Sequence, residues 1–138
     1  MLRFVTTLIT LTLGFSLFGA DFYVCQSAGK KKGPGTKEAP YRAIFDAVKN
    51  AQPGDTIHMA AGSYTGQMGA SEIIIDKPVT IIGGYSPGFT ERNVTKYPTL
   101  IQPSNDKNDT KGLGVLTLDL PSGPGPDMVI DGLIIDQS

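Results

Sequence analysis

The stretch that decides the fold runs from Glu72 to Ile82 and reads Glu-Ile-Ile-Ile-Asp-Lys-Pro-Val-Thr-Ile-Ile. It holds two short runs of β-branched residues, which favour strands, on either side of Asp76-Lys77-Pro78. That break bends a chain but lacks the Asn-Gly or Asp-Gly pair of a two-residue hairpin. Both runs are too continuously apolar for a hairpin with one solvated face, so we expect strands buried on both sides. The pattern predicts parallel pairing.

Short apolar runs of the same kind recur along the chain, separated by Gly, Pro, Asp and Asn. A coil of stacked parallel strands accounts for them, and the predicted class is therefore all-β. Predicted strands cover Phe22–Val24, Thr56–Met59, Glu72–Ile75, Val79–Ile82, Thr99–Gln102, Val115–Leu118, Met128–Ile130 and Leu133–Ile135.

An internal echo supports a coil. Ile74-Ile75-Asp76 is repeated by Val129-Ile130-Asp131, at an offset of 55 residues. This offset predicts about two coils, with residues 86–98 and 105–112 looping outward.

One amphipathic helix is expected before these strands. Pro40 suits a first helical turn, and apolar residues then recur at helical spacing until the chain reaches Pro53-Gly54. We expect this helix to bury one face, formed by Tyr41, Ile44, Phe45 and Val48.

The first twenty residues have the layout of a secretory signal peptide. Arg3 precedes an apolar stretch from Phe4 to Phe18, and the small residues Gly19 and Ala20 follow. The stretch is too short and too rich in threonine for a transmembrane anchor. We therefore predict a leader over residues 1–20, with cleavage after Ala20. The mature chain, residues 21–138, is expected to be secreted, periplasmic or on the cell surface.

Charge and cysteine content exclude several protein classes. The formal net charge is -1 and the one basic run, Lys30-Lys31-Lys32, lies in a predicted loop, so a nucleic-acid partner is not expected. Cys25 is the single cysteine and cannot form an internal disulfide. We expect a buried small residue there, rather than the alternative of a lipid-anchored cysteine.

Several motifs of the mature chain occur in a familiar order. They are Phe22-Tyr23-Val24, Gly33-Pro34-Gly35-Thr36-Lys37, Ala39-Pro40-Tyr41, Pro53-Gly54-Asp55-Thr56-Ile57, Ala61-Gly62-Ser63-Tyr64 and Lys77-Pro78-Val79-Thr80-Ile81-Ile82-Gly83-Gly84. Their order and spacing resemble the amino-terminal module of pectin-lyase-like right-handed parallel β-helix proteins. The resemblance covers most of the mature chain. It implies a right-handed parallel β-helix, or solenoid, whose opening α-helix plugs one end of the coil.

The chain stops at Asp136-Gln137-Ser138, directly after a predicted strand and without a capping element. Repeat folds need polar caps and about three or more repeats. We therefore expect the β-helix to be incomplete at its carboxyl end, or capped by a partner, which includes self-association through that end.

The sequence contains no recognisable catalytic constellation. The resemblance implies a polysaccharide lyase or glycoside hydrolase, but the Gly-His-Gly and Arg-Ile-Lys motifs of the polygalacturonases are absent. The catalytic residues of that family lie on later coils. We therefore assign no catalytic, cofactor-binding or metal-binding residue, and whether the longer protein is an enzyme stays open.

The densest acidic group has carboxylates that Ca²⁺ could use, and it consists of Asp119, Asp127, Asp131 and Asp136. Asp131-Gly132 is also a common bend pair, and we prefer this turn interpretation to a metal site. His58 alternates with its apolar neighbours Ile57 and Met59, so we expect it at the surface.

Three aromatic residues, Tyr85, Phe89 and Tyr97, flank the loop 86–98. They could stack on sugar rings, but anchoring of the loop is the preferred interpretation. Asn93 and Asn108 each begin an acceptor sequon for N-glycosylation, and their modification is a minor hypothesis.

Two functions remain open. The first is the opening segment of an exported β-helix protein that binds or processes a polysaccharide, inactive by itself. The alternative is a non-catalytic surface or adhesin-like scaffold that presents loops such as 86–98.

Overall fold

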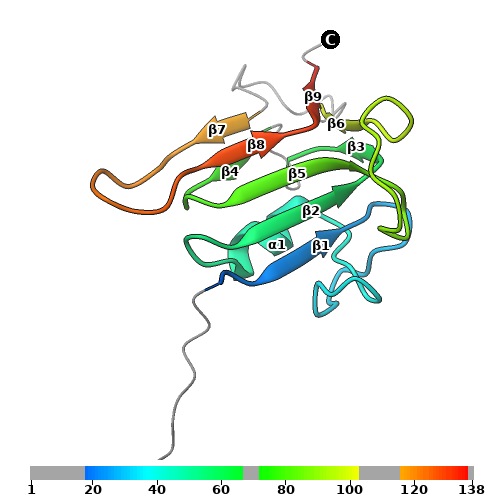
Figure 1. Ribbon diagram of the computed structural model, residues 1–138, viewed down its shortest axis with the longest axis horizontal. Helices are drawn as coiled ribbons and strands as arrows, with labels where there is room; N and C mark the ends of the chain where they lie inside the picture. The colour runs from blue at the N-terminus through cyan, green and yellow to red at the C-terminus, as the bar shows by residue number, and fades with distance from the viewer. Residues whose placement is uncertain (1–17, 67–71, 103–115, 137–138) are drawn as a thin grey trace, which may run out of the picture.

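The computed structural model describes residues 18–66, 72–102 and 116–136 (Figure 1). Strands dominate these residues and a single short helix accompanies them, which confirms the all-β prediction. The elements are β1 (Asp21–Val24), α1 (Ile44–Asn50), β2 (Thr56–Ala60), β3 (Gly62–Tyr64), β4 (Ile73–Ile75), β5 (Thr80–Tyr85), β6 (Thr99–Ile101), β7 (Leu116–Leu118), β8 (Val129–Asp131) and β9 (Leu133–Ile135).

The strands form three sheets in which every pairing between named strands is parallel. Sheet A has the order β1-β2-β5-β8, sheet B the order β3-β6-β9, and sheet C pairs β4 with β7 (Figure 1). From β2 onward the chain visits A, B and C in this order twice, and β8 and β9 begin a third passage. We call one such passage a circuit. The prediction of parallel strands is confirmed.

Equivalent residues of successive circuits lie side by side. Ile57 in β2 is opposite Ile81 in β5, and Ile81 is opposite Ile130 in β8. Because side chains alternate along a strand, this register sends the same positions of neighbouring strands to the same side of the sheet. Ile57 and Ile81 are fully buried, in one core with Ile75 and Ile101.

Helix α1 covers this core at the end where β1 and β2 lie (Figure 1). It buries Ile44, Ala47 and Val48. The helix starts at Ile44 and not at Pro40, because Tyr41 is held in extended backbone through bridges to Val24 and Lys30. Tyr41 is nevertheless buried, at the side of the core.

The prediction of four buried residues on the helix face was wrong for one of them. Phe45 is 42% exposed. A helix of seven residues presents only a narrow stripe to the core, and Ile44, Ala47 and Val48 occupy it.

The expectation of strands buried on both sides was also wrong for the deciding stretch. In β4, Ile73 and Ile75 point into the core, whereas Ile74 between them is 53% exposed. Ordinary alternation therefore holds in this strand. Because the exposed residue, Ile74, is also apolar, the sequence of β4 resembles that of a strand buried on both faces.

The 55-residue echo does not correspond to stacking. Its first segment lies in β4 of sheet C and its second in β8 of sheet A. The true partner of β8 is β5, where Thr80 pairs with Val129, 49 residues later. This separation corresponds to one circuit and not two. The circuit is long because long loops form the corners, the segments that connect a strand of one sheet to a strand of the next. Of the two predicted loops, 86–98 is such a corner and 105–112 lies outside the described residues.

Cys25 is fully buried and free, as predicted. The predicted leader lies almost entirely outside the described residues. In the three described ranges, no helix has the length and apolar character needed to cross a membrane.

Candidate functional site

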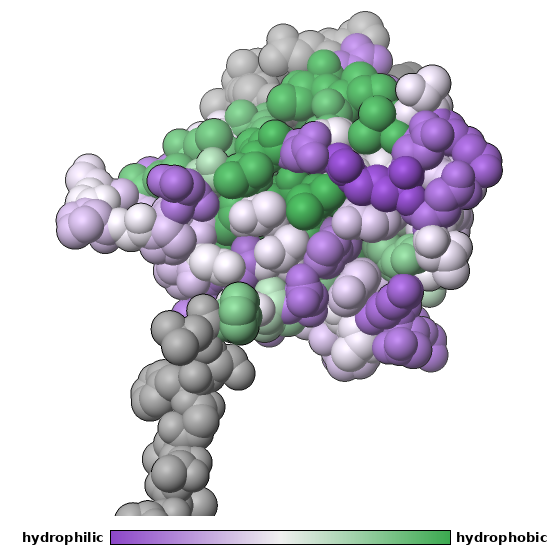
Figure 2. All heavy atoms as spheres, in the orientation of Figure 1, coloured by the Kyte–Doolittle hydropathy of each residue, from purple (hydrophilic) through white to green (hydrophobic). Residues whose placement is uncertain are grey.

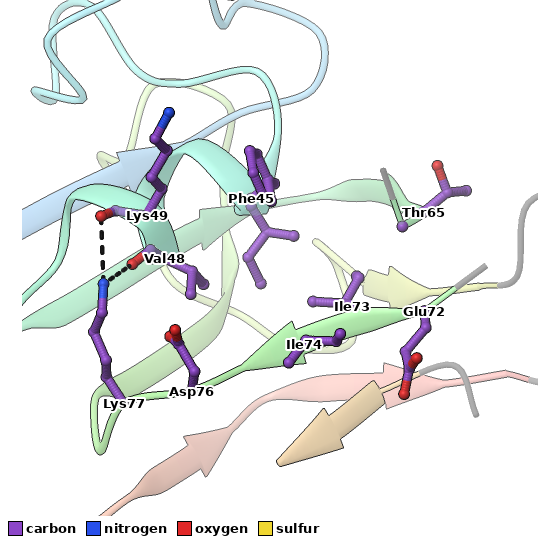
Figure 3. Close-up of a pocket in the computed structure, with 11 residues that line it drawn as sticks. Phe45, Val48, Lys49, Thr65, Glu72, Ile73, Ile74, Asp76 and Lys77 are labelled. Atoms are coloured by element: carbon purple, nitrogen blue, oxygen red, sulfur yellow. Dashed lines mark hydrogen bonds between the residues drawn. The ribbon is translucent and has the colours of Figure 1, made fainter. Parts of the chain in front are cut away.

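A cavity lies between α1 and β4, and we call it the α1–β4 groove. Its volume is about 480 Å³. Figure 3 shows side chains of the helix on one side and those of β4 on the other. The groove is lined by Ile44, Phe45, Val48, Lys49, Thr65, Gly66, Glu72, Ile73, Ile74, Asp76 and Lys77.

The apolar part of the groove follows from how the two elements face the core. Ile44 and Val48 anchor α1 inward, and this turns the neighbouring Phe45 toward the groove. Likewise, Ile73 and Ile75 in β4 point into the core. Ile74 between them is therefore exposed, and it lines the β4 side of the groove. One exposed aromatic ring and one exposed aliphatic side chain thus lie in the same depression.

Charged side chains surround this apolar part, and two of them are fixed. Lys77 Nζ donates to the carbonyl oxygens of Val48 at 2.9 Å and Ala51 at 3.0 Å, so it satisfies the carboxyl end of α1. Glu72 accepts a hydrogen bond from the Thr117 hydroxyl group of β7.

The side chains of Lys49 and Asp76 are exposed at the groove's edge. Neither has a side-chain hydrogen bond or ion pair within the described ranges. The groove therefore offers an apolar surface beside an ammonium donor and a carboxylate acceptor. This combination suits a ligand with both C–H faces and hydroxyl groups.

His58 lies on the opposite side of β2 from Ile57 and Met59, as alternation predicted, but neighbouring side chains largely cover it. A hydrogen bond of 2.8 Å joins its Nε2 to Asp21 Oδ1, and one of 3.1 Å joins its Nδ1 to the Tyr85 hydroxyl. The Tyr23 ring stacks on the imidazole at 4.8 Å between centroids. Through these contacts His58 ties β1, β2 and β5 together.

The four aspartates of the predicted acidic group are not gathered into one site. Asp131 forms a 2.8 Å ion pair with Arg92, whereas Asp136 accepts a hydrogen bond from Gln102. Asp119 and Asp127 are exposed. Over the described part of the chain, no three His, Cys, Asp or Glu side chains are placed to hold a metal ion.

The turn interpretation of Asp131-Gly132 is confirmed. Gly132 has a φ of +70°, a left-handed conformation that places the bend between β8 and β9. A side chain at this position would be strained, so the pair is explained by backbone geometry.

Aromatic residues anchor the loop 86–98 as predicted. Phe89 is buried, and its ring lies 5.0 Å from Tyr23 and 6.0 Å from Tyr85. At the other end of the loop, the Tyr97 hydroxyl donates to Glu91 Oε2 at 2.8 Å. The loop therefore has a fixed shape on the outside of sheet A.

Asn93, in the first sequon, is exposed on this loop, and its Oδ1 accepts hydrogen bonds from the backbone N–H groups of Thr95 and Lys96. Asn108 lies outside the described residues. Modification of either asparagine stays a prediction.

The contact between Tyr97 and Glu91 changes the acidity of the Glu91 carboxyl group. Hydrogen bonds from Tyr97 first, and then from Lys96, lower the pKa of the Glu91 carboxyl group. The contact is therefore complete above the ordinary pKa of a glutamate and is lost as the pH falls through the lowered value. We expect Tyr97→Phe to raise the pKa of Glu91 toward its ordinary range, as followed by carboxyl-carbon NMR. Thr95→Ala, in the same loop, should leave it unchanged, and an unchanged pKa in Tyr97→Phe would contradict the assignment.

Sequence reasoning missed the residues that shape the groove and its surroundings. Phe45 was expected in the core, and Lys77 carried no expectation beyond its place in a bend. A lysine just before a proline gives no local sign that it will reach a helix end 26 residues earlier. These contacts arise only once α1 and β4 are adjacent.

Comparisons with known proteins add one finding. A family model with the description "Protein of unknown function (DUF1565)" matches residues 27–118, about two thirds of the chain. No curated protein and no solved structure matches it.

Proposed function

The chain belongs to the DUF1565 family, and from this premise we propose that it is the helix-capped opening segment of an exported, right-handed parallel β-helix that binds a carbohydrate polymer. The family is associated with parallel β-helix proteins. The observation that carries the carbohydrate proposal is the exposed Phe45 ring in a groove edged by Lys49 and Asp76.

The circuit of three parallel sheets supports the β-helix proposal. Stacked circuits with one core between three sheets are the arrangement that such a helix requires. Crossover connections between parallel strands of one sheet are right-handed in about 98% of cases, which supports the proposed hand. Helix α1 then has the role of the cap at the first circuit.

The far end of the sheets supports a continuing coil. Apolar side chains gather over β8 and β9 in Figure 2, where Val129 is 44% and Ile134 is 48% exposed. The edges of β8 and β9 have no further strand within the described residues. A further circuit of the same fold would pair with these edges and cover the apolar surface.

Export rests on the leader expected over the first residues. Arg3 and the apolar stretch after it fit a signal peptide. A free cysteine buried in the core is compatible with an oxidising compartment, because it has no partner there for a disulfide.

Carbohydrate binding is proposed from the chemistry of the α1–β4 groove. A sugar ring has an apolar C–H face, which packs on an aromatic ring, and hydroxyl groups, which need donors and acceptors. Phe45 supplies the ring, Asp76 an acceptor and Lys49 a donor.

Binding of cellohexaose and of polygalacturonate oligosaccharides to the exported chain, measured by isothermal titration calorimetry, tests this proposal. We expect Phe45→Ala to weaken binding of the recognised sugar about tenfold, since stacking contributes about 1–1.5 kcal/mol. Val94→Ala, an exposed apolar residue of the loop 86–98, is the matched control and should bind normally.

Equal affinities for the Phe45→Ala and unmodified chains would refute the groove as the binding site. Absence of binding to both polymers would favour the alternative function, a non-catalytic scaffold. The fixed loop 86–98 supports that alternative, because Phe89 and the Arg92–Asp131 ion pair hold it on the outer face of the sheets.

A further inference from the structure

A buried carboxylate lies where the chain enters the fold. Asp55 is 6% exposed and ends the turn before β2. Its Oδ2 accepts the backbone N–H of Gln52 at 2.7 Å, and its Oδ1 accepts the backbone N–H of Ala20, also at 2.7 Å. One carboxylate thus joins the turn to the residue that precedes β1.

This carboxylate has no cation within the described part of the chain. The ion pairs found there join His58 to Asp21, Arg92 to Asp131 and Lys96 to Glu91. A buried charge is costly unless it is paired, and two neutral N–H donors compensate it less well than a charged donor. A positive charge at the position of Ala20 N would therefore stabilise this carboxylate.

We propose that the leader is removed by hydrolysis of the Gly19–Ala20 peptide bond, and that the new ammonium group of Ala20 forms an ion pair with Asp55. A leader peptidase adds one water molecule across this bond, which leaves a carboxylate on Gly19 and an ammonium on Ala20. The proposal rests on the proposed export and moves the expected cleavage site by one residue. It identifies Asp55 as the receptor for the mature amino terminus.

The surroundings of Ala20 favour this bond over the one that follows it. The Ala20 carbonyl oxygen accepts the N–H of Thr56 at 2.9 Å, so cleavage after Ala20 would remove contacts to both Asp55 and β2. Cleavage before Ala20 keeps both.

The first test is the amino-terminal residue of the exported protein. The full chain with its leader is expressed in a bacterium, and the exported product is analysed by intact mass and terminal sequencing. We expect a chain that begins at Ala20. An exported chain that begins at any other residue overturns this inference and leaves the export proposal intact, whereas a product that keeps its leader overturns both.

The second test isolates the charge. Selective acetylation of the terminal nitrogen keeps its N–H and removes its positive charge, so we expect the melting temperature to fall by about 4–8 °C. Asp55→Asn keeps the acceptor oxygen and removes the negative charge, so in this variant acetylation should have no effect. No change on acetylation of the unmodified chain overturns the ion pair, and this comparison stands even where Asp55→Asn fails to fold. An equal loss in both chains also overturns it.

Discussion

Replacing Ile75 by alanine lowers the free energy of unfolding by about 2–5 kcal/mol, whereas the same change at Ile74 alters it by less than about 0.5 kcal/mol. Ile75 is fully buried in the core between the three sheets, and its truncation leaves a cavity there. Ile74 is its neighbour in β4 and is 53% exposed, so its truncation leaves no cavity.

Urea unfolding of the two variants and of the unmodified chain measures this difference. The two substitutions remove the same atoms from adjacent residues of one strand, so they form a matched pair. Similar losses at both positions would contradict the alternation of β4 and support a strand buried on both faces.

The second large effect is expected at Tyr64, the last residue of β3. Its ring is 3% exposed, and its hydroxyl lies 2.9 Å from the Ala60 carbonyl oxygen and 3.3 Å from that of Val24. The Tyr64 hydroxyl oxygen also accepts the backbone N–H of Gln26 at 3.3 Å. Burial raises the pKa of Tyr64, so the phenol stays protonated and remains a donor.

Tyr64→Phe should therefore lower the free energy of unfolding by about 1–3 kcal/mol, because it removes a buried hydrogen-bonding group that serves several backbone groups at once. Tyr97→Phe removes the same atom from an exposed hydrogen bond and serves as the control, with an expected change within about 0.5 kcal/mol. Thermal or urea unfolding of both variants decides the point. A neutral Tyr64→Phe would show that the hydroxyl merely fills space.

The sequence predicted most strands because their signal is local. Runs such as Thr56–Met59 and Leu133–Ile135 are rich in β-branched or aliphatic residues and end at turn residues, and both lie close to observed strands. β3 was missed because Gly62-Ser63-Tyr64 has no such residue. Its backbone is extended because it pairs with β6, a partner 37 residues later.

Exposure was harder to predict than strand position. Ile74 and Ile75 have identical side chains in one strand, so only the register against β7 and the core separates them. Tyr41 fitted a helical pattern, but pairing with Val24 overrode it. In both cases a contact between distant segments decided the outcome.

The candidate groove could not be predicted for the same reason. It needs α1 and β4 side by side, and the carbonyl groups that Lys77 caps exist only at the end of a formed helix. The contact between Asp55 and Ala20 spans 35 residues and joins a turn motif to the end of the predicted leader. The motif Pro53-Gly54-Asp55 suggested a turn, but not what its carboxylate would bind.

The parallel stacking of circuits determines how the protein would respond to mechanical tension. β1 and β8 are the two edges of sheet A, and β9 is an edge of sheet B. A force that pulls on the segment after β9 separates this strand from β6 and then β8 from β5, while β2 stays paired on both sides. Full release of this circuit also requires β7 to separate from β4 and β6 from β3, after which the 49 residues between Thr80 and Val129 extend to about 160–180 Å. The protein would lengthen in discrete steps from its far end, and the helix-capped first circuit would open last.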